Sequence, residues 1–162
     1  MHFHPVVSQI LNLLKHHAVW FEAFEHAPVV TSEEAANIRH GYSISQGAKA
    51  LIVRVKRKEK NDEFVMIVLP GDERFNSKKV KTLLTAKDVS FATPEEVARI
   101  TGGVQVGGVP PFGNLFDLHV YADMNVFTNE KIIFNAGDRR YSIAIESESY
   151  KKIVNPEVVE IV

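Results

Sequence analysis

Hydrophobic residues along the chain recur at two different spacings, and each spacing predicts a different kind of element. Apolar residues three and four positions apart line one face of a helix, whereas apolar residues at every second position line one face of a strand. From residue 5 to residue 17 the apolar residues follow the helical spacing, and Pro5 suits the first helical position. This segment is therefore predicted to be a helix that packs one side against the rest of the protein.

Three further helices carry start signals. Two of them have the Thr-x-x-Glu pattern of a capping box, in which each side chain bonds the backbone N–H of the other residue. The third has a residue that can cap a first turn, followed by apolar residues at helical spacing. The predicted starts are Thr31 (with Glu34), Asn76 or Ser77, and Thr93 (with Glu96), and the first and last of these helices are predicted to end at Gly41 and at Gly102-Gly103.

Short runs of β-branched, aromatic and other apolar residues predict the strands. Two of the runs are joined by a charged segment with a turn signal at Asn61-Asp62, which predicts a hairpin. The predicted strands are residues 19–24, 48–55, 64–69, 115–121, 131–134 and 141–145, and residues 150–161 are expected to form a short helix or an extended tail. Strands interrupt the helices without a regular βαβ alternation. We therefore expect one α+β domain over residues 1–162, with a mixed or antiparallel, barrel-like sheet and packed helices.

Composition limits the classes of function. The chain has 162 residues, no cysteine and a net charge of -1. The lack of cysteine excludes a disulfide framework, a thiolate zinc site and a cysteine nucleophile. We expect no signal peptide, no membrane-spanning segment and a cytoplasmic location. Proteins that coat nucleic acid non-specifically are usually strongly basic, so a nucleic-acid partner would have to be bound locally.

Two common kinds of catalytic site have no signature in the sequence. The seven histidines form no H-E-x-x-H motif and no compact cluster with acidic residues, so no metal site is expected. The G-x-S-x-G motif of serine hydrolases is also absent. We expect no cofactor.

Lys49 is the most informative single residue. In a strand it would share a face with Leu51, Val53 and Val55. A lysine on an apolar face is costly unless its ammonium reaches water, a carboxylate or an anionic ligand. The alternative is an ordinary surface lysine whose stem lies along the sheet while its ammonium stays in solvent.

The loop of residues 102–113 is the second candidate. It contains five glycines and two consecutive prolines, and it matches neither a P-loop nor a dinucleotide-binding fingerprint. Such a loop would be stiff and would offer backbone N–H groups, which a carbonyl or a developing oxyanion requires. A plain connection between two elements is the alternative.

Three weaker candidates have an ordinary structural interpretation that is favoured over a functional one. Residues 134–138 are interpreted as a tight turn between two strands, and Pro70-Gly71 before Asp72 is a turn signal first. His26, just after the first predicted strand, could face a pocket, although a structural histidine is the default.

Taken in order, these segments resemble the YbaK family of freestanding editing domains, which is related to the insertion domain of bacterial prolyl-tRNA synthetase. The resemblance covers nearly the whole chain, and its specific part is the strand lysine together with a G-x-x-x-P loop. The segments that carry it are Glu25-His26-Ala27-Pro28-Val29, Thr31-Ser32-Glu33-Glu34-Ala35-Ala36, Gln46-Gly47-Ala48-Lys49-Ala50-Leu51, Leu69-Pro70-Gly71-Asp72, Thr93-Pro94-Glu95-Glu96-Val97, Thr101-Gly102, Gly107-Gly108-Val109-Pro110-Pro111-Phe112-Gly113 and Phe134-Asn135-Ala136-Gly137.

The resemblance implies an enzyme that hydrolyses the ester of a mischarged tRNA, with tRNA-Pro or a similar tRNA and a small wrong amino acid as substrate. A positioned water or the terminal ribose hydroxyl would attack the ester. The Lys49 amine is expected to face the glycine loop of residues 102–113 across a gap that fits an esterified adenosine end. The implied partners are the acceptor end of the tRNA and an aminoacyl-tRNA synthetase. The implied catalytic residues are Lys49, Gly107 and Gly108, and the implied substrate-binding residues are His26, Thr31, Asp72, Pro110, Pro111, Phe112, Gly113, Asn135, Ala136 and Gly137.

Two alternatives stay open from the sequence. A non-catalytic module could bind tRNA or a synthetase with the same pocket. A Schiff-base enzyme could use Lys49 as its nucleophile, which would require a neutral amine and an acid/base partner.

Overall fold

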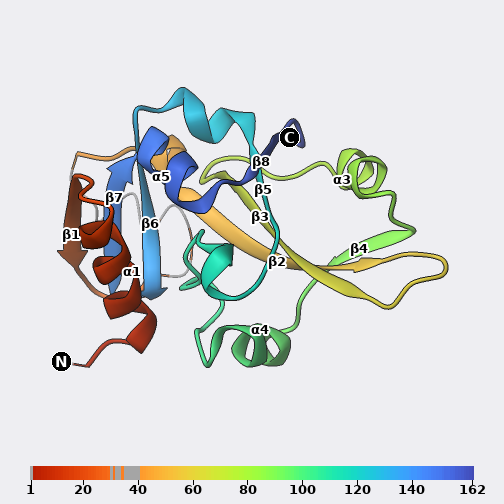
Figure 1. Cartoon of the computed structure of the whole chain (residues 1–162), viewed down its shortest axis with the longest axis horizontal. Helices are drawn as coiled ribbons and strands as arrows, with labels where there is room; N and C mark the ends of the chain where they lie inside the picture. The colour runs from red at the N-terminus through yellow and green to blue at the C-terminus, as the bar shows by residue number, and fades with distance from the viewer. Residues whose placement is uncertain (1, 30, 32–33, 35–40) are drawn as a thin grey trace.

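The protein consists of two β-sheets with helices packed against them (Figure 1). The structure is a computed structural model, and it describes residues 2–29, 31, 34 and 41–162. The smaller sheet has the order β1-β7-β6, and the larger has the order β4-β2-β3-β5-β8. The strands are β1 (Phe21–Glu25), β2 (Ala48–Lys56), β3 (Glu63–Pro70), β4 (Asp88–Phe91), β5 (Val120–Asp123), β6 (Lys131–Asp138), β7 (Tyr141–Glu146) and β8 (Glu157–Val159).

The two sheets differ in strand direction. All pairs in the smaller sheet are antiparallel, whereas β3–β5 and β5–β8 in the larger sheet are parallel. An isolated bridge between Gly47 and Ile133 joins the sheets, and they do not close into a barrel. The expectation of an α+β domain with a mixed sheet is confirmed, and the barrel-like arrangement is not found.

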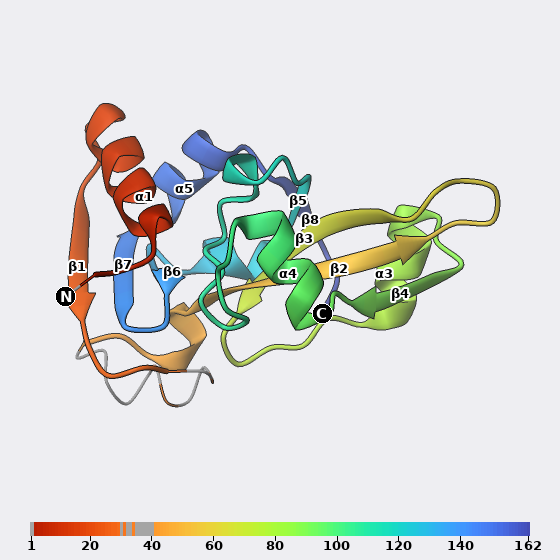
Figure 2. The same cartoon turned by 90° about the horizontal axis from the view of Figure 1, so that it is seen from below.

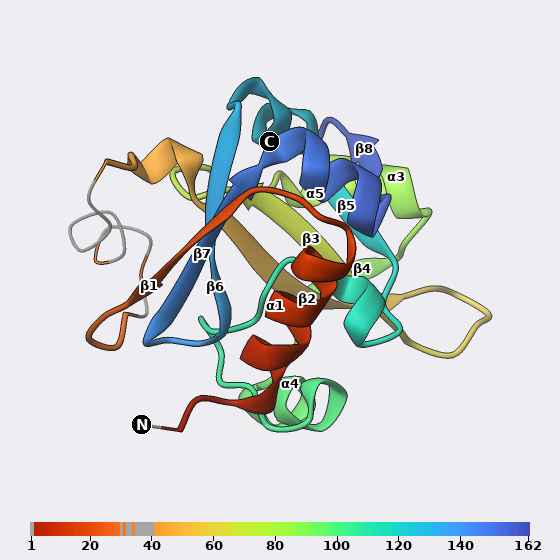
Figure 3. The same cartoon turned by 60° about the vertical axis from the view of Figure 1, so that its left-hand side comes forward.

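Three of the helices begin where the sequence signals predict. Helix α1 (Pro5–His16) has Pro5 at its start, and Figure 3 shows it alongside β6 and β7. The capping box of Thr93 and Glu96 starts α4 (Pro94–Thr101), and Asn76 caps α3 (Ser77–Leu84). The last helix, α5 (Ser147–Val154), begins before the segment 150–161 that was expected to form a short helix or a tail, and β8 lies in the rest of that segment.

The helix predicted between residues 31 and 41 falls mostly outside the described residues. Within them, the Glu34 N–H donates to Thr31 Oγ1 at 3.1 Å, which is one half of the predicted capping box.

The β2–β3 hairpin is buried on both faces, which divides the hydrophobic core into two clusters. Ala48, Ile52 and neighbouring strand residues pack toward α1, β6 and α4. On the other face, Val53 and Val55 pack toward α3. Figure 2 shows the hairpin extending away from the smaller sheet with α3 and β4 beside it. The strand faces predicted from alternation therefore correspond to the two clusters.

Two sequence predictions are wrong in detail, and one strand was missed. Residues 115–121 are not one strand, because the chain forms a 3₁₀ turn at Gly113–Leu115 and Asp117 takes a left-handed φ of 57° before β5 begins. Residues 134–138 are not a turn; they lie in β6 around a register shift, and the turn follows them. Strand β4 was not predicted, because it is short and pairs with a strand far away in sequence.

Gly137 allows α1 to approach β6 closely. Its φ is 103°, and a Cβ built there would lie 2.7 Å from Val6 Cγ1. Gly102 also has a positive φ, of 75°, but a Cβ there would meet nothing within 4 Å. An alanine at position 102 would therefore introduce backbone strain alone, whereas an alanine at position 137 would introduce both backbone strain and steric overlap.

We expect Gly137→Ala to destabilise the protein by more than Gly102→Ala. Both variants lose about 1–2 kcal/mol to the left-handed backbone, and Gly137→Ala should lose about 1–3 kcal/mol more to overpacking against Val6. Urea unfolding at pH 7 measures both free energies. Equal losses would show that α1 moves away from β6 at no cost, contrary to the close packing described.

Candidate functional site

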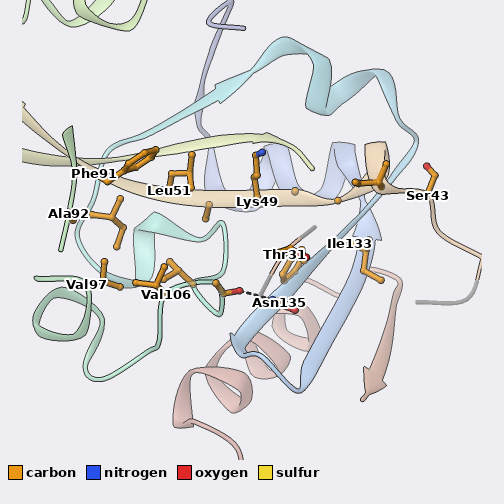
Figure 4. A pocket seen from close by; sticks show the side chains of 18 residues that line it. Thr31, Ser43, Lys49, Leu51, Phe91, Ala92, Val97, Val106, Ile133 and Asn135 are labelled. Atoms are coloured by element: carbon orange, nitrogen blue, oxygen red, sulfur yellow. Dashed lines mark hydrogen bonds between the residues drawn. The ribbon is translucent and has the colours of Figure 1, made fainter. Parts of the chain in front are cut away.

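A pocket of about 250 Å³ follows the edge of β2 (Figure 4). Six consecutive residues, Gly47 to Ile52, line it, so the pocket meets the edge of the strand rather than one face. The edge is accessible because β4 pairs with β2 only from Val53 to Lys56. The other lining residues are Thr31, Ser43, Ile44, Phe91, Ala92, Val97, Val106, Gly107, Val109, Ile133, Phe134 and Asn135.

The backbone of β2 presents polar groups to this pocket. The Ile52 carbonyl accepts the Ala92 N–H at 3.0 Å, on the β4 side of the strand. Backbone groups of alternate residues in a strand point to the same edge. The N–H and C=O of Ala50 therefore point toward the pocket side, where β4 no longer pairs.

The opposite wall is a loop that we call the glycine strap, Val106-Gly107-Gly108-Val109. Three consecutive carbonyls tie it to the β6–β7 hairpin. Arg139 Nε donates to the Val106 carbonyl at 2.8 Å, and the Gly137 N–H donates to the Gly108 carbonyl at 2.8 Å. Between them, Asn135 Nδ2 donates to the Gly107 carbonyl at 2.6 Å. The strap is thus a fixed wall.

The two glycines predicted to be catalytic differ in position. Gly107 lines the pocket and has a φ of 90°, a conformation that favours glycine. Gly108 does not line it, and its N–H donates to the Gln105 carbonyl at 2.9 Å. Of the two, Gly107 is therefore the one placed to contact a ligand.

Lys49 lies at the rim of the pocket, and its ammonium does not face the strap. Its side chain shares the strand face of Leu51 and Val53, whereas Ala50 and Ile52 share the face of the strap-side cluster. Figure 4 shows the Lys49 side chain leaving β2 on the side opposite Val106 and Asn135. The sequence predicted correctly which residues share the strand face of Lys49. It could not predict which later segment of the chain covers that face, because this depends on tertiary packing.

Burial lowers the pKa of the Lys49 amine, and the nearby Arg74 guanidinium lowers it further. Asp72 and Glu73 act in the opposite direction. The ammonium donates to the Gly71 carbonyl at 3.4 Å. Lys49 is the one charged side chain among the described residues that line the pocket, so it is the group there that can attract an anion.

The other predicted site residues fall into three groups. Thr31 and Asn135 line the pocket. Asp72 lies outside the lining but acts electrostatically on Lys49. The remaining residues do not line the pocket: His26, Pro110, Pro111, Phe112, Gly113, Ala136 and Gly137.

The prolines and Phe112 anchor the strap to the core. The Phe112 ring packs against Phe134 and Tyr150 at centroid distances of 5.3 and 5.7 Å. The Tyr150 hydroxyl donates to the Pro111 carbonyl at 2.7 Å. This segment therefore fixes one end of the strap.

Sequence reasoning missed the aromatic side of the pocket mouth. Phe91 lines the pocket and is 63% exposed. Its ring meets Phe75 edge-on, at 5.7 Å and 72°. An exposed phenylalanine in an unpredicted strand gives no signal of its own in the sequence.

Within the described ranges, no group of three or more histidines or acidic residues could hold a metal ion. No helix found there is long and apolar enough to cross a membrane.

The sequence and the fold are both similar to known proteins. The aminoacyl-tRNA editing domain matches residues 26–153. The multifunctional Ser/Thr-tRNA deacylase ProXp-y of Escherichia coli (strain K12) is 32% identical over 153 residues, which are 94% of this chain and 90% of that protein. The proline--tRNA ligase of Bacillus licheniformis is 35% identical over 101 residues, covering 62% of this chain and 17% of the ligase.

A solved structure of a candidate trans-editing enzyme for prolyl tRNA synthetase has the same fold. It matches with a TM-score of 0.80 and 23% identity, over 99% of this chain and 98% of the other. The chain belongs to the aminoacyl-tRNA editing domain family. This family is hydrolytic, so the protein is an enzyme of the deacylase class.

Asp138 fixes the turn that carries Arg139. Its carboxylate accepts hydrogen bonds from Arg140 Nε at 2.9 Å, Arg140 Nη2 at 2.8 Å and the His4 N–H at 3.2 Å. Hydrogen bonding to Arg140 lowers the pKa of Asp138 from 3.8 to about 2, against an opposing effect of burial. The ionised carboxylate therefore stabilises the folded protein above pH 4, and this stabilisation is lost as the pH falls through 2.

We expect Asp138→Asn to lower the free energy of unfolding at pH 7 by about 1–3 kcal/mol. The difference from wild type should shrink as the pH falls from 4 toward 2, because wild type then loses the same charge. Urea unfolding at several pH values measures it, with Glu59→Gln at the exposed hairpin tip as control. A difference in free energy of unfolding that stays constant with pH would contradict a stabilising role for the ionised Asp138 carboxylate.

Proposed function

We propose that the protein removes a small, wrongly attached amino acid from the 3′-terminal adenosine of a tRNA, acting in trans. The observation that carries the proposal is the pocket between the open edge of β2 and the glycine strap, with Lys49 at its rim. The similarity to a Ser/Thr-tRNA deacylase over most of both chains supports it. The volume of about 250 Å³ suits a small side chain with its ester.

The reaction needs no protein nucleophile, because an aminoacyl ester is already activated. A water, or a water positioned by the neighbouring ribose hydroxyl, adds to the ester carbonyl carbon. The bond from that carbon to the ribose oxygen then breaks, the ribose oxygen takes a proton, and the amino acid leaves as a free acid. Backbone N–H groups of Gly107 and Ala50 are suited to polarise the carbonyl.

Lys49 has a separate task in this mechanism. Its ammonium lies on the face of β2 opposite the strap, so it contacts the tRNA end rather than the reacting carbonyl. A lysine ammonium is a compact point charge that suits a phosphate oxygen. The amino acid and the nucleotide are thus held on different sides of one strand edge.

Phe91 is the group best placed to hold the terminal base. The base lies one ribose away from the ester, at the mouth of the pocket, and Phe91 is an exposed aromatic ring in that lining. Edge-on packing against Phe75 fixes the ring while its face stays accessible. Stacking of a base on an aromatic ring contributes about 1–3 kcal/mol.

We expect Lys49→Ala to lower kcat/KM for a mischarged tRNA by about ten-fold or more, since a charged contact to the tRNA is lost. Hydrolysis of an aminoacyl methyl ester should be unchanged, because this substrate has no phosphate. The assay follows ester loss from tRNA-Pro charged with each small amino acid, with Lys58→Ala at the hairpin tip as control.

If wild type leaves every ester at its spontaneous rate, the enzymatic proposal is wrong. Tight binding of tRNA without turnover would instead identify a non-catalytic module. A lysine adduct trapped by borohydride with a carbonyl substrate would favour the Schiff-base alternative.

We expect Phe91→Ala to lower kcat/KM for aminoacyl-tRNA by about 5- to 100-fold, the equivalent of one lost stacking interaction. Phe91→Trp should retain most of the activity because it keeps an aromatic face. Leu83→Ala, which shortens a similarly exposed apolar side chain on α3, is the control. Equal losses for the tRNA and the methyl ester would rule out a contact with the base.

A further inference from the structure

We infer that Ile44 limits the size of the amino acid that the pocket accepts, and that Tyr42 is a positioning residue that holds Ile44 in place through its contact with Glu22 of β1. The inference rests on the proposed function and adds to it the group that sets specificity. Ile44 lines the pocket, whereas Tyr42 and Glu22 do not, so neither of these two needs to touch the substrate.

The pocket is elongated, and its two ends differ. It follows the chain from Gly47 to Ile52, and five residue steps of extended chain span about 16 Å. Phe91 lies toward the Ile52 end, since the next residue of the chain bonds the Ile52 carbonyl. At the Gly47 end, Ile133 forms a bridge with Gly47, and the Ile44 carbonyl accepts the Gly47 N–H at 3.0 Å. Figure 4 shows Phe91 and Ile133 toward opposite ends of the lining.

The proposed function assigns one part of the substrate to each end. The terminal base is placed against Phe91, and the backbone groups suited to polarise the ester carbonyl, those of Ala50 and Gly107, lie part-way along the pocket. The amino acid side chain therefore extends toward the Gly47 end. A pocket rejects a larger side chain by means of the wall that this side chain meets. Ile44 and Ile133 are the branched apolar residues of that wall.

Ile44 is the member of this wall whose position depends on contacts outside its own element. Ile133 is part of β6, but Ile44 begins a three-residue 3₁₀ turn, η1 (Ile44–Gln46), which has few internal hydrogen bonds. The chain after Ile44 is anchored, because Asn129 Nδ2 donates to the Ser45 carbonyl at 2.9 Å. The chain before Ile44 needs an anchor of its own.

Tyr42 supplies that second anchor. Its hydroxyl donates to Glu22 Oε1 at 2.6 Å, and its ring meets Phe24 edge-on, at 6.0 Å and 75°. Glu22 and Phe24 both belong to β1, which pairs with β7 in the smaller sheet. Burial raises the pKa of the Tyr42 phenol above its usual value, and the hydrogen bond to Glu22 raises it further, so the hydroxyl keeps its proton. A regular sheet is thus connected to the residue two positions before Ile44.

A positioning role differs from a merely structural one in what it does to specificity. If Tyr42 only stabilised the fold, its loss would lower the free energy of unfolding and change kcat/KM by the same factor for every amino acid. If it holds Ile44 against the substrate, its loss lets the wall retreat. A larger amino acid should then gain relative to a small one.

The test measures kcat/KM for one tRNA charged either with leucine or with a small amino acid, namely alanine or serine, whichever wild type hydrolyses faster. The ratio of the small amino acid to leucine is the discrimination. We expect Ile44→Ala to lower this ratio by about 10- to 100-fold, because the space of several methyl or methylene groups is opened. Ile44→Val should lower it by less, and it serves as the milder variant if Ile44→Ala does not fold.

Tyr42→Phe removes the hydroxyl and keeps the ring against Phe24. We expect it to lower the discrimination by about 3- to 10-fold, the equivalent of one hydrogen bond to a carboxylate. Glu22→Ala should have the same effect, and the double variant should be no worse than the worse single one, because both remove one contact. Glu22→Gln keeps an oxygen acceptor and should retain most of the discrimination.

Tyr121→Phe is the matched control. Tyr121 is also a half-buried tyrosine, but it lies on β5 and does not line the pocket. Its replacement should leave the discrimination unchanged. An unchanged ratio in Ile44→Ala, an equal loss for both amino acids in Tyr42→Phe, or the same change in Tyr121→Phe would overturn the inference while leaving the proposed function intact.

Binding of a stable analogue tests the inference without turnover. The probe is an acceptor-stem RNA whose terminal adenosine carries alanine or leucine through a 3′-amide, and calorimetry gives a Kd for each. The preference for the alanine probe should fall in Ile44→Ala and Tyr42→Phe, as the kinetic ratio does. A wild type that hydrolyses no ester but shows this change in binding would count against the proposed function alone, and equal preferences in all variants would overturn the inference.

Discussion

The open edge of β2 between Gly47 and Ile52 is the constraint on which the rest of the site depends. Strand edges with accessible N–H and C=O groups are places where another chain or a ligand can bind. The last hydrogen bond to this edge joins the Ala92 N–H to the Ile52 carbonyl. Pairing with β4 ends there because the next residue, Thr93, is the N-cap of α4. The glycine strap then returns across the gap as an irregular loop, which leaves room for a ligand.

Much of this arrangement could be predicted from local signals in the sequence. The capping box at Thr93 fixed the start of α4, and the alternation of apolar residues assigned Lys49 to the correct face of β2. The glycine and proline content of residues 102–113 indicated a stiff loop, and its backbone does form a wall of the pocket. These features depend on spacing within a few residues, which the sequence records directly.

Other features depend on pairing between distant segments and could not be predicted in this way. Strand β4 is stabilised by β2, more than thirty residues earlier, and Phe91 enters the pocket only through that pairing. Asn135 was expected in a turn, but a register shift in β6 places it against Gly107. Lys49 was expected to face the strap, and this failed because the strap crosses the opposite face.

Under the proposed function, the separation of Lys49 from the strap would give the site a physical rule for choosing its substrate. A ligand that contacts both must pass over the edge of β2, with its anionic part on one face and its carbonyl on the other. A free amino acid is too short to do so, whereas an amino acid esterified to a nucleotide has a phosphate several bonds beyond the ester. If the edge of β2 supplies backbone donors for the carbonyl, as proposed, the same edge would therefore also favour a long, charged leaving group over a small ester.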